Sequence, residues 1–251
     1  MYRFGLKLWS INKNYIQEAV RLYEKGVYQY IELFAVVGSY KKYISLWKDL
    51  QIPYVVHAPH SLGGGLNLAK KELRENNFKL AKESFMYADA LNAPIVIFHP
   101  GFDGNIKETV TQLKMIKDNR IVVENKPYET IFPDKFCNGF SVSEISFVLA
   151  ETGVGFCLDF GHAICAANSS KLDPYEHIGE FNKLNPKMYH LSNKKMGSCL
   201  DEHLHLRDGD YDLKKFLKNM PNDSIITIET DKKLQNNLED FENDIIYLIS
   251  L

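Results

Sequence analysis

The sequence lacks the features of several specialised classes of protein. No run approaches the roughly 18 apolar residues of a membrane-spanning helix. The N-terminus lacks a basic segment followed by an apolar stretch, so we expect a cytoplasmic protein without a signal peptide. The four cysteines form no CxxC pair, which excludes a redox dithiol or a zinc ribbon.

The sequence also lacks a large excess of positive or negative charge. Lys plus Arg total 30 and Asp plus Glu total 32, so the formal net charge is −2. This balance gives no net attraction to phosphate and excludes a strongly basic protein that coats nucleic acid. Intrinsic disorder is also excluded, because 45% of the residues are hydrophobic and can form a sizeable core.

Short apolar runs rich in β-branched and aromatic residues recur along the chain, as buried strands require. They predict eight strands, at Arg3–Leu8, Tyr28–Phe34, Pro53–Ala58, Pro94–His99, Arg120–Glu124, Val154–Asp159, Lys187–Leu191 and Ser224–Thr230. Segments with helical periodicity lie between them and include Asn12–Lys25, Ala69–Leu91, Ser141–Glu151 and about Leu234–Leu251. Ser141 and Glu144 have the spacing of a capping box at a helix start.

Strand and helix alternate about eight times in 251 residues, without a linker. This pattern predicts a single domain, residues 1–251, folded as a (β/α)8 TIM barrel. The alternative, a doubly wound open sheet, predicts a glycine fingerprint after the first strand. Leu8–Asn12 contains no glycine, and Gly63–Gly65 lacks the spacing of a phosphate-binding motif, so we interpret it as a flexible loop.

The predicted strands from the third to the eighth each end in an imidazole or a carboxylate: His57, His99, Glu124, Asp159, His190 and Glu229. The carboxyl ends of barrel strands surround the active site. Buried together, these groups would repel one another and lose hydration unless a cation lay between them. One such residue is usually structural, but six in a row indicate a divalent metal site.

Three further candidate ligands lie just beyond strand ends, namely His162, Asp201 and His203. Histidine mixed with carboxylates, without thiolate, suits zinc, manganese or another first-row metal in hydrolytic or Lewis-acid chemistry. A non-catalytic metal-binding barrel is the alternative from another class of function, and nothing in the sequence favours it.

The segments that carry these residues follow a characteristic order: His57-Ala-Pro, Phe98-His99-Pro-Gly, Val123-Glu124-Asn125, Leu158-Asp159-Phe-Gly-His162, His190-Leu-Ser-Asn193-Lys194, Asp201-Glu-His203 and Ile228-Glu229-Thr230. Together they resemble the endonuclease IV family (AP endonuclease family 2), which are metal-dependent apurinic/apyrimidinic endonucleases of the xylose-isomerase-like TIM barrel superfamily. The resemblance covers nearly the whole chain. It implies a monomeric enzyme of DNA base excision repair that cleaves DNA 5′ to an abasic site and leaves a 3′-hydroxyl.

The resemblance also implies three metal ions, typically zinc, with manganese or iron as alternatives. The implied ligand sets are His57, His99 and Glu124 for the first ion; Glu124, Asp159, His190 and Glu229 for the second; and His162, Asp201 and His203 for the third. Glu124 would be the catalytic residue that bridges two ions. Two ions would hold and deprotonate a water, and the third would neutralise the leaving oxygen.

Some positions depart from the family pattern. His60 stands where the family usually has a tyrosine that contacts DNA around the lesion. The loop Ala35–Tyr40 lacks the arginine expected of a loop that penetrates the duplex. We predict substrate contacts from residues next to the ligands, namely His60, Asn125, Asn193, Lys194 and Arg207.

The alternative within the superfamily is a sugar isomerase or epimerase with a small sugar substrate. The resemblance implies that such an enzyme needs one divalent metal, held by the equivalents of Glu124, Asp159, His190 and Glu229. The full set of nine ligands favours the nuclease, whereas the altered loops favour the isomerase.

Overall fold

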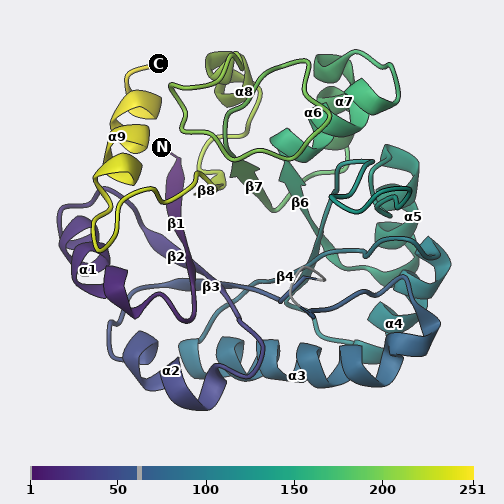
Figure 1. Ribbon diagram of the computed structural model, residues 1–251, viewed down its shortest axis with the longest axis horizontal. Helices are drawn as coiled ribbons and strands as arrows, with labels where there is room; N and C mark the ends of the chain where they lie inside the picture. Colours follow the sequence, from purple (N-terminus) through teal and green to yellow (C-terminus); the bar gives the residue numbers. More distant parts are fainter. Residues whose placement is uncertain (1, 61–63) are drawn as a thin grey trace.

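The apolar runs form the strands of a closed parallel barrel in the computed structural model, which describes residues 2–60 and 64–251 (Figure 1). Within these residues each strand pairs with the next one in sequence, and the first pairs with the last. The strands are β1 (Arg3–Trp9), β2 (Tyr30–Phe34), β3 (Tyr54–His57), β4 (Val96–Phe98), β5 (Ile121–Glu124), β6 (Gly155–Asp159), β7 (Met188–Leu191) and β8 (Ile225–Ile228). The predicted (β/α)8 fold is therefore confirmed.

Helices surround the ring of strands in Figure 1. They are α1 (Ile16–Glu24), α2 (Tyr40–Lys48), α3 (Arg74–Leu91), α4 (Ile106–Ile116), α5 (Val142–Thr152), α6 (Phe160–Ser169), α7 (Pro174–Asn182), α8 (Leu213–Lys218) and α9 (Glu239–Ile249). Two helices, α6 and α7, join β6 to β7, and one α-helix joins each other pair of consecutive strands. The last helix lies beside the first, where Arg21 contacts Glu242 at 3.2 Å.

Local polar residues explain why helix α9 starts later than predicted. Helix α9 begins at Glu239 rather than near Leu234, because Asn236 has left-handed backbone geometry and Asn237 accepts a hydrogen bond from the amide of Glu239 at 2.6 Å. At α5 the Ser141 hydroxyl caps the Glu144 amide as predicted. In a capping box the Glu144 carboxylate would accept a hydrogen bond from the amide of Ser141. Here it accepts one from the amide of Gly139 instead, at 2.8 Å.

Inside the barrel the lower layer of side chains is apolar. Successive residues of a strand point to opposite faces, so every second side chain points inward. The inward-facing cluster consists of Tyr30, Val55, Ile97, Val122, Cys157 and Met188. Gly5 on β1 leaves room for the ring of Tyr30, whose nearest atom lies 2.2 Å from where a Cβ of residue 5 would stand. This layer forms a packed floor beneath the mouth.

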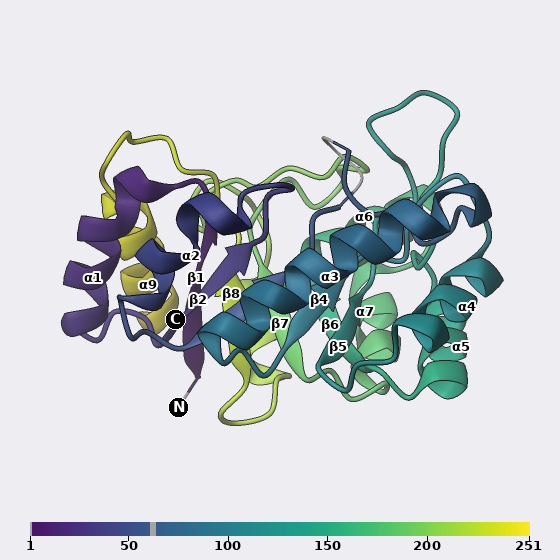
Figure 2. The same ribbon diagram turned by 90° about the horizontal axis from the view of Figure 1, so that it is seen from below.

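The side view shows the loops that follow the strands gathered at one end of the barrel, opposite the N-terminus (Figure 2). The teal loop between β5 and α5 projects beyond its neighbours there. Of the predicted flexible segment Gly63–Gly65, Gly63 lies outside the described residues. None of the helices described is both long and apolar enough to cross a membrane.

Candidate metal centre

A polar layer lies directly above the apolar floor, because residues two positions apart on a strand share a face. Two residues beyond Val55, Ile97, Val122, Cys157 and Met188 come His57, His99, Glu124, Asp159 and His190. Most of these side chains are buried, and Glu124 and His190 are at most 1% exposed. The strand pattern therefore brings five of the predicted ligands together at the mouth.

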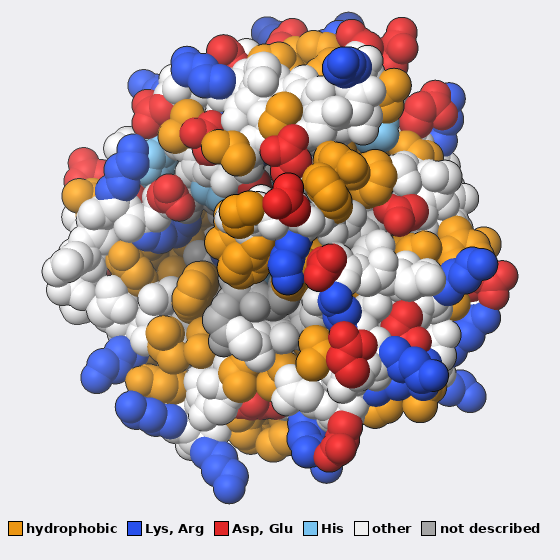
Figure 3. All heavy atoms as spheres, turned by 45° about the vertical axis from the view of Figure 1, so that its right-hand side comes forward, with side chains coloured by type: hydrophobic (Ala, Val, Ile, Leu, Met, Phe, Trp, Pro, Cys, Tyr) orange, Lys and Arg blue, Asp and Glu red, His pale blue; other side chains and the backbone are white. Residues whose placement is uncertain are grey.

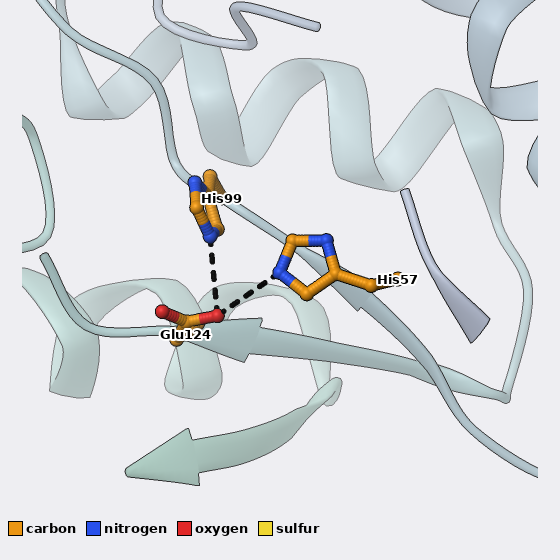
Figure 4. A group of neighbouring side chains, drawn as sticks. All are labelled: His57, His99 and Glu124. Atoms are coloured by element: carbon orange, nitrogen blue, oxygen red, sulfur yellow. Dashed lines mark hydrogen bonds and ion pairs between the residues drawn. The ribbon is translucent and has the colours of Figure 1, made fainter. Parts of the chain in front are cut away.

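The first cluster forms around one oxygen of Glu124. His57 from β3 and His99 after β4 both point at Glu124 on β5, with their Nε2 atoms 3.2 and 3.1 Å from its Oε2 (Figure 4). The Nδ1 of His57 donates to the carbonyl oxygen of Ala58 at 2.8 Å. A carbonyl only accepts, so this bond places the proton on Nδ1 and leaves Nε2 with a lone pair for a metal ion.

The second cluster surrounds a buried nitrogen of His190. Its Nδ1 has no hydrogen-bond partner among the described residues. This atom lies 2.9 Å from Glu229 Oε1, 3.4 Å from Glu124 Oε2 and 3.9 Å from Asp159 Oδ2. A buried, unpartnered nitrogen that faces three carboxylates fits a divalent cation held by mixed nitrogen and oxygen ligands.

The third cluster forms in the loop between β7 and α8. Asp201 Oδ2 lies 3.0 Å from His162 Nε2 and 3.4 Å from His203 Nε2. The Nδ1 atoms of the two histidines donate to backbone carbonyls, of Asn125 at 2.9 Å and of Glu229 at 2.6 Å. Each histidine thus presents Nε2 to the carboxylate, as a metal ligand would. The structure therefore brings all nine predicted ligands into three adjoining clusters.

Neighbouring groups hold His162, His203 and Glu124 in their charged forms. Burial alone would lower the pKa of His162, but Asp159 and Asp201 raise it to about 10. Burial acts in the same direction on His203, and Asp201 raises its pKa to about 9. Burial would raise the pKa of Glu124, yet the neighbouring His99 and His190 hold it well below the ordinary range. Bound cations would supply the positive charge that protons on these histidines otherwise provide.

A cavity of about 580 Å³ opens above the clusters. Its floor includes Glu124 and His162, and its walls carry Trp9, Phe34, Phe102, Ile131 and Phe132. The outer face in Figure 3 mixes positive, negative and hydrophobic side chains, and the atoms coloured there form no broad basic patch. This face therefore offers a polyanion no broad surface of positive charge.

The residues predicted to contact substrate occupy different places. Among the described residues of that set, His60 alone lines the cavity, with its ring stacked on that of His99 at 4.9 Å. Burial and the neighbouring His57 lower the pKa of His60 to about 3, so its imidazole is neutral at physiological pH. Arg207 is exposed and lies over the ring of Tyr247 at 5.0 Å.

Asn125, Asn193 and Lys194 are buried behind the ligands. Asn125 exchanges two hydrogen bonds with the backbone of Asp159, at 2.8 and 2.9 Å. Asn193 donates to the carbonyl of Leu206 at 2.7 Å and so holds the loop that carries the third cluster. The Lys194 ammonium lies 3.4 Å from Asp201 Oδ1, on the side away from the two histidines. These contacts orient ligands rather than reach into the cavity.

Three charged residues at the mouth were not predicted. Glu32 accepts hydrogen bonds from His190, Lys7 contacts both Glu32 and Glu229 at 2.5 Å, and Lys126 Nζ lies 3.1 Å from His162 Nε2. For Glu32 the available signal was a lone charged residue inside an otherwise apolar strand, and for Lys7 it was a lysine between two leucines inside a strand. Lys126 lines the cavity two residues after Glu124.

Comparison with known proteins agrees with this architecture. The model of the family described as "Xylose isomerase-like TIM barrel" matches residues 28–250. The curated "Probable endonuclease 4" of Thermoplasma volcanium is 25% identical over 164 residues, which cover 59% of this chain and 56% of the relative. The match therefore spans little more than half the length of that relative.

Two solved structures share the fold over nearly their whole length. A D-tagatose 3-epimerase-like protein has a TM-score of 0.76 at 20% identity, covering 99% of this chain and 96% of the other. Endonuclease IV from Thermus thermophilus has a TM-score of 0.72 at 19% identity, covering 99% of this chain and 100% of the other. At these identities the likeness establishes the fold alone.

Proposed function

The chain belongs to the xylose isomerase-like TIM barrel family, and within it we propose that the protein is a metal-dependent phosphodiester hydrolase that cleaves DNA 5′ to abasic sites. It would act as a monomer with three divalent ions, zinc by preference. The observation that carries the proposal is the third cluster, in which His162 and His203 meet at Asp201 Oδ2.

The third cluster supports hydrolysis over isomerisation, because the two reactions need different numbers of metal ions. One ion beside His190 could be held by three carboxylates, those of Glu124, Asp159 and Glu229. The remaining five candidate ligands would then have no metal to bind, although each presents a donor atom to a neighbouring ligand. Phosphodiester cleavage, by contrast, uses several ions to stabilise both the attacking and the leaving oxygen.

The side chains at the cavity floor suggest how the reaction would proceed. Bound divalent ions would act as Lewis acids toward the scissile phosphate and the attacking water. Glu124, whose Oε2 lies near His57 of the first cluster and His190 of the second, would keep these two neighbouring sites together. The Lys126 ammonium, 3.1 Å from His162, is placed to hold a phosphate oxygen. His60 lies on the cavity wall with a neutral imidazole, and it would orient the DNA sugar that binds next to it.

A sugar isomerase or epimerase with one metal ion is the second candidate. The cavity favours it, because a volume of about 580 Å³ with aromatic walls suits a small ligand. The loop after β2 also favours it, because Ala35, Val36 and Val37 offer no charge to a DNA backbone. The same His190 cluster would then hold the ion, and the substrate would lie against Trp9 and Phe34.

One experiment separates the two proposals. Metal-loaded protein is incubated with a duplex that contains a tetrahydrofuran abasic analogue, and in parallel with a panel of ketoses and aldoses. The nuclease proposal expects a nick 5′ to the analogue with a 3′-hydroxyl that a polymerase extends, and no such nick with Glu124→Gln. Conversion of a sugar without any nick, by protein shown to contain its metal, would reject the nuclease in favour of the isomerase.

A further inference from the structure

Glu32 is a buried carboxylate at the mouth that none of the predicted ligand sets includes. It lies on β2 and is 0% exposed. Its Oε2 accepts hydrogen bonds from His190 Nε2 at 2.9 Å and from Thr227 Oγ1 at 2.6 Å, and its Oε1 accepts one from Lys7 Nζ at 2.5 Å. Both carboxylate oxygens are therefore engaged by side chains of three other strands, β1, β7 and β8.

The hydrogen bond to Glu32 decides which nitrogen of His190 faces the second cluster. An ionised carboxylate only accepts hydrogen bonds, so the bond to Glu32 requires the proton on Nε2. In a neutral imidazole Nδ1 then carries the lone pair. That atom is the buried nitrogen without a hydrogen-bond partner in the described chain, 2.9 Å from Glu229 Oε1. Carboxylates orient metal-binding histidines in this manner.

Lys7 extends the same arrangement to Glu229. Its Nζ lies 2.5 Å from Oε1 of Glu32 and 2.5 Å from Oε1 of Glu229. Ligand atoms of Glu32, His190 and Glu229 are close enough to hold an ion by themselves. The Lys7 ammonium already lies between the two carboxylates, however, and offsets their charge. The same Oε1 of Glu229 lies 2.9 Å from the Nδ1 of His190, so Lys7 holds it beside that nitrogen.

We propose that Lys7 and Glu32 are positioning residues of the second metal site. Glu32 fixes the Nδ1 of His190 toward the ion, and Lys7 fixes the Oε1 of Glu229 beside that nitrogen. The inference rests on the metal centre of the proposed function, and neither residue belongs to the nine predicted ligands. Loss of either partner should weaken the binding of one ion by roughly 10- to 100-fold and leave the other ions in place.

Two variants test this role without any substrate. Glu32→Gln keeps the shape of the side chain but removes its charge, and Lys7→Met keeps the length but removes the ammonium. Each protein is titrated with Co²⁺ against a competing chelator, and the visible absorption of bound cobalt reports the ligand set. We expect one ion to bind roughly 10- to 100-fold more weakly in both variants, with an altered spectrum.

Glu108→Gln is the matched control, because it removes a carboxylate paired with Arg74 at 2.6 Å on α4, outside the barrel. It should bind cobalt as the wild type does. Wild-type affinity and spectrum in both Glu32→Gln and Lys7→Met would overturn the proposal. If Glu32→Gln does not fold, Glu32→Asp, which withdraws the carboxylate from His190, must show the same loss. A wild-type protein that binds no ion would instead reject the proposed function.

Discussion

Glu124 is the residue on which two adjoining clusters depend. Its Oε2 lies near His57 and His99 of the first cluster and 3.4 Å from His190 Nδ1 of the second. A neutral amide keeps the shape but loses the charge that a cation requires. We predict that Glu124→Gln lowers metal content and slows incision by roughly 1000-fold or more, which corresponds to several kcal/mol.

Incision kinetics and metal content measure the effect of Glu124→Gln, and circular dichroism should show an unchanged fold. Glu129→Gln is the control, because Glu129 lines the same cavity while its carboxylate accepts from Ser169 at 3.3 Å. Incision by Glu124→Gln at the wild-type rate would contradict the bridging role.

Lys126 allows a second test at the scale of single residues. A charge-assisted hydrogen bond to a phosphate oxygen contributes about 1.5–3 kcal/mol, so Lys126→Met should weaken incision by roughly 10- to 100-fold. Lys126→Arg should restore part of the loss, because it keeps the charge. Metal content, measured beside the kinetics, should not fall in either variant. The role is excluded if Lys126→Met incises as well as the wild type.

The sequence predicted the side chains that meet at the barrel mouth better than it predicted the residues behind them. Candidate ligands such as His57 and Glu124 end apolar runs, which marks them as groups at the barrel mouth. Glu32 meets His190 only because closure of the barrel brings β2 within reach of β7, which no local pattern encodes. Lys194 was predicted to contact substrate, yet its side chain is fully buried, with its ammonium 3.4 Å from Asp201 Oδ1.

At the scale of elements, the loop between β7 and α8 determines whether the third cluster forms. Gly209 in this loop packs so closely on Asn193 that a Cβ at residue 209 would lie 2.2 Å from its Oδ1. Because Asn193 holds the loop, Gly209→Ala should displace Asp201 and His203. We predict that this variant loses one of its metal ions and retains the others.

Gly197→Ala is the matched control in the same loop, because among the described residues, apart from its chain neighbours, no heavy atom lies within 4 Å of the added Cβ. It should bind metal as the wild type does. Metal content and thermal unfolding of the two variants are measured together. Full occupancy in Gly209→Ala would show that the loop does not position the third cluster.

Element positions were largely predictable, whereas several helix starts were not: α1 begins at Ile16 rather than Asn12, α3 at Arg74 rather than Ala69, and α9 at Glu239 rather than near Leu234. Buried strands read as apolar runs, and period-two alternation already fixes which residues reach the mouth. The apolar spacing of Leu238, Phe241 and Ile245 extends the helical pattern toward Leu234. The backbone instead adopts left-handed geometry at Asn236, and the side chain of Asn237 accepts a hydrogen bond from the amide of Glu239, so helix α9 starts only after them.

At the scale of the whole molecule, the histidine pKa values predict how stability without metal depends on pH. In the folded chain the pKa values of His162 and His203 are raised from 6.5 to about 10 and about 9. A raised pKa stabilises the folded state fully below pH 6.5, and this stabilisation is lost as the pH rises through the folded values. Chelator-treated protein should therefore unfold at progressively lower temperature between about pH 7 and pH 10.

Metal-loaded protein should show a smaller change over this range, since bound cations replace the protons on these histidines. Scanning calorimetry of both forms across the pH range measures the difference. Each kcal/mol lost should lower Tm by about 2–4 °C in a chain of this size. A Tm of the chelated form that stays level or rises toward pH 10 would contradict the assigned pKa directions.

The number of metal ions per chain tests the central claim of a three-ion centre most directly. Protein prepared without chelator is dialysed to equilibrium against zinc, and its metal content is measured by mass spectrometry. The account predicts three ions per chain, and two in the double variant Asp201→Asn with His203→Ala, which removes two of the ligands that meet at the third site. A wild-type protein that retains a single ion would contradict the account.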